Sequence, residues 1–299
     1  MADAEVTRRD DDLVDAHGIR IHYTVWAPRT PRAVVHLLHG VGEHAGRYSH
    51  VGAALAKAGY EVWADDHRGH GRTGAEQHAG RPERLGRLGP GGHRAAVDAV
   101  RLISARARQA RPELPLVLFG HSWGSLMAQI ILNDHAGDYD AAILMGTAHR
   151  TVRHMNGGDL NARHRHLGDT GLEWLSRDPA VPHAFKADLL TTDVPLLKLF
   201  GVRDTLRLLG RPARGLPDLP LLIMVGDDDP LGGAESARHL ARDYRERSGL
   251  TDVTVTVYEG ARHELVNETN QDEVIGDLIA WLDQRAMLAT HREVEDPLE

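Results

Sequence analysis

Ser122 lies in the pentapeptide GHSWG (120–124), which matches the G-x-S-x-G pattern of a nucleophilic serine. An apolar run at 114–120 leads into the pattern and a helical stretch at 125–133 follows it, so the serine occupies a strand-to-helix turn. Such a turn is strained, and side chains at the two glycine positions would collide with the neighbouring strand and helix. The pattern predicts a nucleophile held above a sheet edge; the alternative is an ordinary turn whose serine caps a helix.

A serine hydroxyl becomes reactive when a base removes its proton, and the base needs a carboxylate that orients it. Where this turn pattern occurs, the partners follow in the order serine, acid, histidine. The expected strand at 219–225 ends in three aspartates, and the expected strand at 252–258 is followed by His263. Loops at the carboxyl ends of adjacent strands form the site of an open parallel sheet. The sequence therefore predicts His263 as the base and leaves the acid open among Asp227, Asp228 and Asp229.

The negative charge that develops on a carbonyl oxygen during serine attack needs two backbone N–H donors. One is that of Trp123, at the start of the helix after the serine. The other is expected from the loop HGVGEH (39–44), whose glycines let the backbone approach a substrate closely, and we assign it to Val41. The alternative for 39–44 is a plain loop. His121 adjoins the nucleophile in the chain, so it is expected to point away and pack behind the turn.

The elements that must position these residues are short apolar runs that alternate with amphipathic helical stretches. Strands buried on both faces and joined by helices indicate an α/β fold with a mostly parallel central sheet and helices on both faces. Besides the elements already given, we expect strands at 19–27, 33–39, 60–65 and 141–145 and helices at 48–58, 91–110, 235–246 and 272–288.

The segment 147–217 fits no alternation of strands and helices, and it interrupts the sheet between two strands. We expect it to form an inserted cap over the carboxyl edge of the sheet. The core is then 13–146 together with 218–288, and 1–12 and 289–299 are polar tails.

The composition excludes several classes of function. A net charge of −8 argues against a nucleic-acid partner, which normally meets a basic surface. No apolar run approaches the roughly 18 residues of a membrane span, and 1–12 lacks an apolar signal-peptide core, so a cytoplasmic location is expected. The chain has no cysteine, which excludes disulfides, zinc–thiolate sites and a cysteine nucleophile.

At this point the chain resembles the monoacylglycerol lipase and lysophospholipase branch of the α/β-hydrolases. The likeness rests on HGVGEHAGRY (39–48), DHRGHGRT (66–73) and the serine pentapeptide, and the loops at 226–231 and 258–264 agree with it. It extends over about 19–282, excluding much of 147–217. The resemblance implies that Asp229 is the acid and that the other two aspartates are solvated or cap the following helix. It also implies that three residues hold the oxyanion loop and line the polar end of the pocket: Glu43, His44 and Arg47.

The segment 147–217 departs from that family, in which it is largely apolar. Its first part carries eight basic or histidine residues against one acid, Asp159: His149, Arg150, Arg153, His154, Arg163, His164, Arg165 and His166. They indicate either a solvated basic face or recognition of an anionic group. No i, i+4 pair with a supporting carboxylate stands out, so no metal is expected. Apolar candidates for the acyl side are Leu172, Trp174, Leu175, Phe185, Leu189, Leu196, Leu197 and Phe200, of which Trp174, Phe185 and Phe200 are the aromatic pocket candidates.

These features predict a cofactor-free serine carboxylic-ester hydrolase that cleaves monoacylglycerols or similar small acyl esters through an acyl-enzyme. Transient contact with a lipid surface is expected through the cap. One alternative is a lysophospholipase. A second is an aminopeptidase of the proline-iminopeptidase type, although its usual glycine before the serine is replaced here by His121. A non-catalytic binding protein is disfavoured because no triad member is missing.

Overall fold

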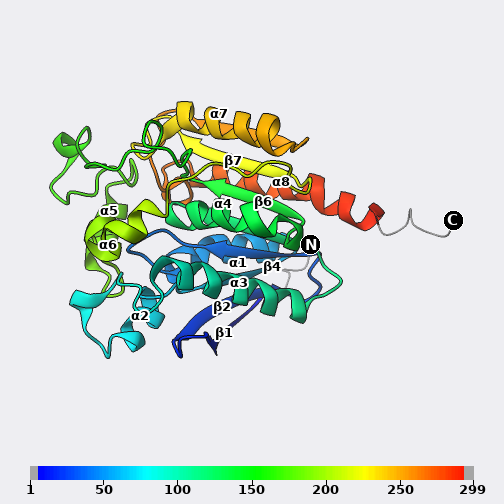
Figure 1. Cartoon of the computed structure of the whole chain (residues 1–299), viewed down its shortest axis with the longest axis horizontal. Helices are drawn as coiled ribbons and strands as arrows, with labels where there is room; N and C mark the ends of the chain where they lie inside the picture. Colours follow the sequence, from blue (N-terminus) through cyan, green and yellow to red (C-terminus); the bar gives the residue numbers. More distant parts are fainter. Residues whose placement is uncertain (1–5, 293–299) are drawn as a thin grey trace.

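The computed structural model describes residues 6–292, with side chains up to residue 285, and has an eight-stranded sheet at its centre (Figure 1). The strand order is β1-β2-β4-β3-β5-β6-β7-β8. The pairs β1–β2 and β2–β4 are antiparallel, and all pairs from β4 to β8 are parallel. The strands are Val6–Val14 (β1), Arg20–Pro28 (β2), Ala33–Leu38 (β3), Tyr60–Asp65 (β4), Leu116–His121 (β5), Ala141–Met145 (β6), Leu221–Gly226 (β7) and Val253–Tyr258 (β8).

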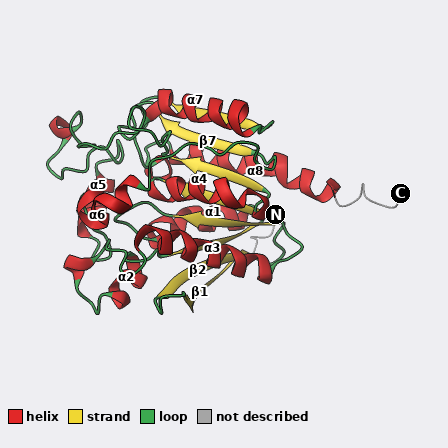
Figure 2. Ribbon diagram, in the orientation of Figure 1, coloured by secondary structure: helices red, strands yellow, loops and turns green. Residues whose placement is uncertain are grey.

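Helices cover both faces of the sheet (Figure 2). On one face lie α3 (Gly92–Ala110), α4 (Trp123–His135) and α7 (Gly233–Asp243); on the other lie α1 (Ser49–Lys57) and α8 (Gln271–Arg292). The remaining helices are α2 (Gly71–Gln77), α5 (Ala180–Ala187) and α6 (Leu196–Leu206), with short 3₁₀ or π turns at Ala45–Tyr48, Pro82–Arg84, Ala136–Asp138, Arg165–Leu167, Tyr244–Ser248 and Leu265–Asn267.

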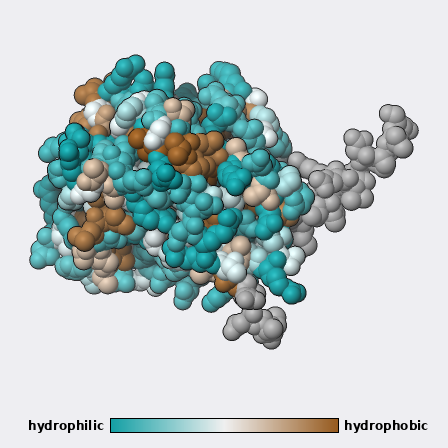
Figure 3. All heavy atoms as spheres, turned by 90° about the horizontal axis from the view of Figure 1, so that it is seen from below, coloured by the Kyte–Doolittle hydropathy of each residue, from teal (hydrophilic) through white to brown (hydrophobic). Residues whose placement is uncertain are grey.

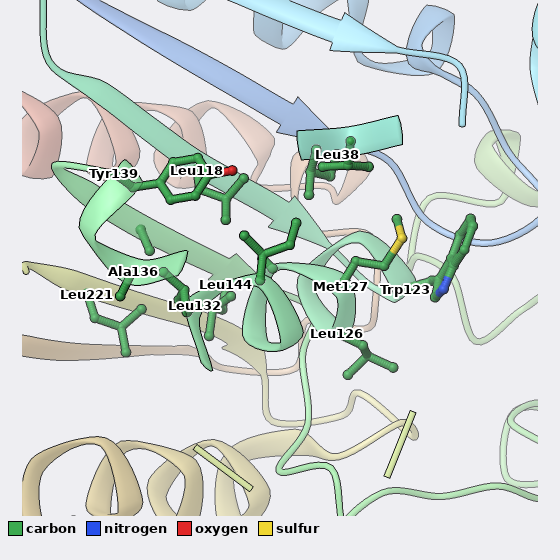
Figure 4. Packing of buried hydrophobic residues seen from close by; sticks show 14 of the residues in the cluster. Leu38, Leu118, Trp123, Leu126, Met127, Leu132, Ala136, Tyr139, Leu144 and Leu221 are labelled. Atoms are coloured by element: carbon green, nitrogen blue, oxygen red, sulfur yellow. The ribbon is translucent and has the colours of Figure 1, made fainter. Parts of the chain in front are cut away.

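The core consists of two apolar clusters separated by the sheet. Along β5, Leu116 and Leu118 point into the cluster under α3, α4 and α7, whereas Val117 and Phe119 point into the one under α1 and α8. Figure 4 shows the first cluster, with side chains of α4 beside strand residues. Successive strand residues face opposite sides, so a continuous apolar run fills both clusters. The predicted fold class is therefore confirmed.

Two expectations about the ends of the chain are corrected. The polar tail expected at 1–12 is wrong in its described part, because Val6–Val14 forms the edge strand β1. This strand has no apolar alternation; it pairs through its backbone and exposes charged side chains such as Arg8 and Asp10, which are usual on edge strands. At the other end α8 continues to Arg292, into the expected tail 289–299. Residues 1–5 and 293–299 lie outside the described residues.

The segment 147–217 contains α5 and α6, which lie toward one end of the sheet, on the left of Figure 1. It is bound to the loops that leave β3 and β8. The backbone N–H of Thr192 donates to the carbonyl of Gly42 at 2.8 Å, and that of Glu264 donates to the carbonyl of Leu175 at 2.7 Å. The segment therefore contacts loops at the carboxyl ends of two strands, β3 and β8. Among the described residues, no helix has the length and apolar character needed to cross a bilayer.

The position of a leucine relative to this core predicts how much its replacement lowers the free energy of unfolding. Leu118→Ala, at a fully buried position of β5, should lower the free energy of unfolding by about 2–5 kcal/mol, because it removes apolar contact and leaves a cavity. Leu102→Ala on α3 is the control: Leu102 is 40% exposed, and its variant should stay within about 0.5 kcal/mol of wild type. Urea unfolding followed by circular dichroism measures both, and equal midpoints would contradict this account of the core.

Candidate active site

The turn at Ser122 has the strained geometry that the sequence predicts. Its backbone has φ 51° and ψ −122°, a conformation that residues other than glycine rarely adopt. A Cβ atom on Gly120 would lie 2.5 Å from the carbonyl oxygen of Gly124, and one on Gly124 would lie 2.4 Å from that of Leu38. Both obstacles are backbone atoms, so no side-chain movement relieves them. Glycine is therefore required on both sides of the serine.

Ser122 is hydrogen-bonded to a histidine that is itself held by a carboxylate. The Oγ of Ser122 lies 2.8 Å from Nε2 of His263, and Nδ1 of His263 lies 3.0 Å from each carboxylate oxygen of Asp229. All three residues are buried. A carboxylate at Nδ1 fixes the tautomer in which Nε2 can accept the serine proton. This arrangement can carry out nucleophilic acyl transfer.

The three consecutive aspartates have different partners. Only Asp229 faces the imidazole. Asp227 is exposed, as the resemblance implies, and accepts a hydrogen bond from the backbone N–H of Gly260 at 2.7 Å. Asp228 differs from that expectation, since its carboxylate lies 2.8 Å from Nε2 of His164 and thereby binds the segment 147–217.

The loop after β3 presents its backbone to the serine. A Cβ atom on Gly40 would lie 3.0 Å from Cβ of Ser122, so the loop passes directly beside the nucleophile. The N–H of Gly40 donates to Oε1 of Glu43 at 2.8 Å. The next N–H, that of Val41, has no acceptor among the described residues. Trp123 begins α4, and the first N–H groups of a helix lack acceptors within it. Both predicted oxyanion donors are thus available.

A buried ion network holds this loop in place. Nη1 of Arg47 lies 2.6 Å from Glu43, and the two terminal nitrogens of Arg47 each lie 2.7 Å from an oxygen of Glu264. The hydroxyl of Tyr48 donates to Glu43 at 2.7 Å and lies 2.6 Å from Nδ1 of His121. His121 therefore packs behind the turn, as expected.

The charges in this network are mutually stabilised. Burial alone would raise the pKa of the Glu43 carboxyl, but Arg47 and the hydrogen bond from His121 hold that pKa well below its usual range. Burial opposes ionisation of His121, yet Glu43 raises the pKa of His121 above its usual value. Glu43 is a fixed negative charge at neutral pH. Its oxygens bind the loop and Arg47, so these two residues have the loop-holding position that the resemblance implies.

The segment 147–217 brings its predicted aromatic residues to the same place. The ring of Trp174 lies 4.7 Å from that of His263, and the ring of Phe200 lies 5.0 Å from that of Trp123. The guanidinium carbon of Arg47 lies over the ring of Phe185, 4.8 Å from the ring centre. His44 binds the same segment through Asp188, with Nε2 2.8 Å from the carboxylate. Of the six predicted pocket candidates, Trp174 contacts His263 and Phe200 contacts Trp123, the residue after Ser122. Glu43, His44 and Arg47 lie in the segment that follows β3, and Phe185 contacts Arg47.

Two residues near Trp123 were not predicted. The rings of His70 and His93 lie 5.1 and 6.0 Å from that of Trp123, and burial lowers the pKa of each to about 4. Both are neutral at physiological pH and extend the aromatic surface beside the serine. Nothing in their sequence spacing indicates this position, because His70 precedes α2, His93 lies at the start of α3, and only the fold brings both to Trp123.

Most of the basic residues at 149–166 already have partners. The buried guanidinium of Arg150 donates to Gln129 and to the carbonyl of Leu208. The other pairs are His149 with Asp243, Arg163 and His164 with Asp228, and Arg165 with Asp159. Several of these basic side chains are therefore held by hydrogen bonds or ion pairs within the protein. Although the sequence predicts no metal, the structure brings together three potential metal ligands away from the triad: His154, Glu235 and His239.

Comparison with known proteins shows which family model and which relatives the sequence matches. The model of the family described as "Serine aminopeptidase, S33" matches residues 29–270. A monoacylglycerol lipase of Mycolicibacterium smegmatis is 35% identical over 292 residues, covering 92% of this chain and 97% of its own length. The human monoglyceride lipase is 28% identical, covering 93% and 91%.

Solved structures agree on the fold. A thermostable carboxyl esterase from Bacillus coagulans, crystallised with glycerol, superposes with a TM-score of 0.75 at 22% identity, covering 94% of this chain and 99% of that one. A monoglyceride lipase variant from Saccharomyces cerevisiae superposes with a TM-score of 0.69 at 21% identity, covering 95% and 96%.

Because the aspartates have different environments, we expect their substitutions to change turnover by different amounts. Asp229→Asn should lower turnover of a short aryl ester about 10⁴-fold, the size of this effect in another serine hydrolase, because the amide favours the wrong tautomer of His263. Ser122→Ala sets the inactive reference, with a loss of about 10⁶-fold. The matched control Asp227→Asn should stay near wild type.

Steady-state kinetics on the purified variants measures these effects, and circular dichroism verifies that each variant is folded. A folded Asp229→Asn enzyme with turnover close to that of Asp227→Asn would remove Asp229 from the site.

Proposed function

The chain belongs to the serine aminopeptidase S33 family and is a serine hydrolase of the α/β-hydrolase fold, and we propose that it cleaves monoacylglycerols and similar small acyl esters. The observation that carries this proposal is the hydrogen-bonded series from Ser122 through His263 to Asp229, which offers a nucleophile, a base and an orienting carboxylate in one buried site. The substrate class is supported by the identity to relatives named monoacylglycerol or monoglyceride lipase.

In the proposed mechanism, Nε2 of His263 takes the hydroxyl proton as Oγ of Ser122 attacks the ester carbonyl. The N–H groups of Val41 and Trp123 donate to the resulting oxyanion. Protonated His263 then gives its proton to the leaving alcohol, and an acyl-enzyme remains on the serine. A water molecule, deprotonated by the same imidazole, attacks the acyl carbon and releases the carboxylic acid and the free serine.

We propose that 147–217 acts as a cap that binds the acyl chain. Trp174 brings apolar surface beside His263, and Phe200 brings it beside Trp123. Leu172, Leu175 and Phe185 form a small buried cluster of their own, so this part of the cap has a fixed shape. Neutral histidines extend the same surface. Such a lining suits an acyl chain, which gains about 0.8 kcal/mol for each methylene that it buries.

The family description favours aminopeptidase activity as a second candidate. A substrate with a free ammonium group needs a carboxylate that is not already neutralised. The two buried carboxylates next to the site, Glu43 and Glu264, both bind Arg47. This pairing favours an uncharged ester over a peptide amine. The lysophospholipase alternative loses support because the basic residues at 163–165 are already paired with Asp228 and Asp159.

We also propose that the enzyme works from the cytoplasm and touches lipid transiently through the cap. Seven of the nine exposed large apolar residues of the described chain lie in 147–217: Val152, Leu167, Leu189, Val194, Leu197, Val202 and Leu206. Figure 3 shows apolar surface gathered into patches on one face, among hydrophilic atoms. Clustered apolar surface is typical of contact with a membrane or another protein. Cell fractionation tests the location.

The substrate proposal predicts a chain-length profile. For monoacylglycerols, kcat/KM should rise about fourfold per methylene until the cap is filled, and then level off or fall. Lysophospholipids of matched chain length and prolyl amides should be poorer substrates. Parallel assays of the three series measure this, with Ser122→Ala as the blank. Faster cleavage of prolyl amides, or of lysophospholipids at every chain length, would replace the proposed substrate class.

The lipid-contact proposal predicts that a variant of the cap can lose vesicle binding and keep its activity on a soluble ester. A Leu189→Ser/Val202→Ser variant, with changes at positions 87% and 66% exposed, should bind phosphatidylcholine vesicles several-fold more weakly. Its kcat/KM on a water-soluble short ester should be unchanged. The control is Leu102→Ser on α3, outside the cap. Vesicle co-sedimentation measures binding, and equal binding by wild type and the cap variant would contradict the proposal.

A further inference from the structure

Two histidines and a glutamate meet on the side of the protein where 147–217 passes α7. One ligand atom from each of His154, Glu235 and His239 lies within 4.8 Å of the others. Glu235 and His239 are four residues apart on α7 and so share one helix face, with Nε2 of His239 3.7 Å from Glu235. The ring centre of His154 lies 4.3 Å from that of His239.

The hydrogen bonds behind His154 favour a tautomer in which its Nε2 is free. Nε2 of His149 lies 2.8 Å from Asp243, so it carries the proton and leaves a lone pair on Nδ1. The hydroxyl of Thr151 lies 3.3 Å from that Nδ1 and 3.0 Å from Nδ1 of His154. The hydroxyl can donate to His149 and accept from Nδ1–H of His154. This tautomer places a lone pair on Nε2 of His154.

Nε2 of His154 is buried and has no hydrogen-bond partner within the described part of the chain. A buried polar atom normally has a partner, so this nitrogen needs an explanation. Histidines that bind metals typically have their other ring nitrogen held by a carboxylate, carbonyl or hydroxyl group. The relay from Asp243 through His149 and Thr151 is a support of this kind.

Open space adjoins two of these three residues, His154 and Glu235. A cavity of about 250 Å³ is lined by His154 and Glu235 together with Asn156, Ser236 and Leu231, among others. Three protein ligands leave a fourth position of a tetrahedral ion unfilled, and a cavity of this size holds several water molecules.

We propose that His154, Glu235 and His239 bind a divalent transition metal ion of the zinc class, with water from the cavity as the fourth ligand. Two imidazoles and one carboxylate are a donor set that suits zinc. The ion would join 149–156 to α7. Asn156 already binds the loop of the proposed acid, with its side-chain amide donating to the carbonyl of Pro230 at 3.1 Å. The site therefore strengthens one attachment of the cap and does not depend on the substrate proposed for the triad.

The test measures zinc binding by the full chain. Calorimetric titration gives the stoichiometry and affinity, and thermal unfolding gives the change in Tm. Wild type should bind one zinc ion per chain, and its Tm should rise by about 4 °C when zinc is at about 100 times Kd. Glu235→Gln and His239→Ala should each weaken zinc binding at least tenfold and lose most of the Tm shift. His166→Ala is the matched control, because it removes an exposed histidine of the same segment outside the cluster.

Unfolding without zinc verifies that each variant is folded, and the charge-neutral Glu235→Gln keeps the shape of the side chain. Absence of a one-to-one zinc complex in wild type would overturn the proposal. Equal zinc affinity in wild type, Glu235→Gln and His239→Ala would overturn it as well, because the ion would then be bound at another site.

Discussion

The guanidinium of Arg47 connects the two loops on which the site depends. It binds Glu43, in the loop after β3, and Glu264, next to His263 in the loop after β8. Three strands separate β3 from β8 in the sheet, so these two strands do not pair directly and no hydrogen bond between them sets the distance between their loops. Removing one partner of a buried ion pair costs about 3–5 kcal/mol, and the three groups therefore persist as a unit. Because Glu43 also binds the N–H of Gly40, the proposed oxyanion donor and the proposed base are held in one frame.

How much of the fold is predictable depends on whether an element buries side chains. The inner strands β3, β5 and β7 were predicted to within two residues, since both of their faces are packed and their apolar runs are continuous. The edge strand β1 was missed. It pairs on one side only and is held by backbone hydrogen bonds and surface ion pairs, and neither leaves an apolar period in the sequence. The end of α8, at 289–292, was also missed.

Some parts of the site can be predicted from local sequence, and others depend on contacts between distant residues. The serine turn is predictable because backbone contacts leave room only for glycine at 120 and 124. Spacing alone could not choose among three adjacent aspartates, and the family resemblance made the choice that the distance from His263 to Asp229 now supports. The contact of Arg47 with Glu264 joins residues 217 positions apart. No local pattern encodes a pair of this kind, and the same holds for His154 beside α7.

Two of the backbone hydrogen bonds of the segment 147–217 join it to the loops beside the proposed triad. Thr192 is bonded to the loop that holds Val41, and Leu175 is bonded to the residue after His263. A rigid movement of the whole segment that broke both bonds would disturb the loops that carry the proposed oxyanion donor and the proposed base. For the proposed cap, we therefore expect substrate to enter by bending of the stretches between these two anchors. Variation in the stretches between them can change which molecules enter while the rate of bond cleavage is preserved, which gives selectivity and turnover separate routes of evolution.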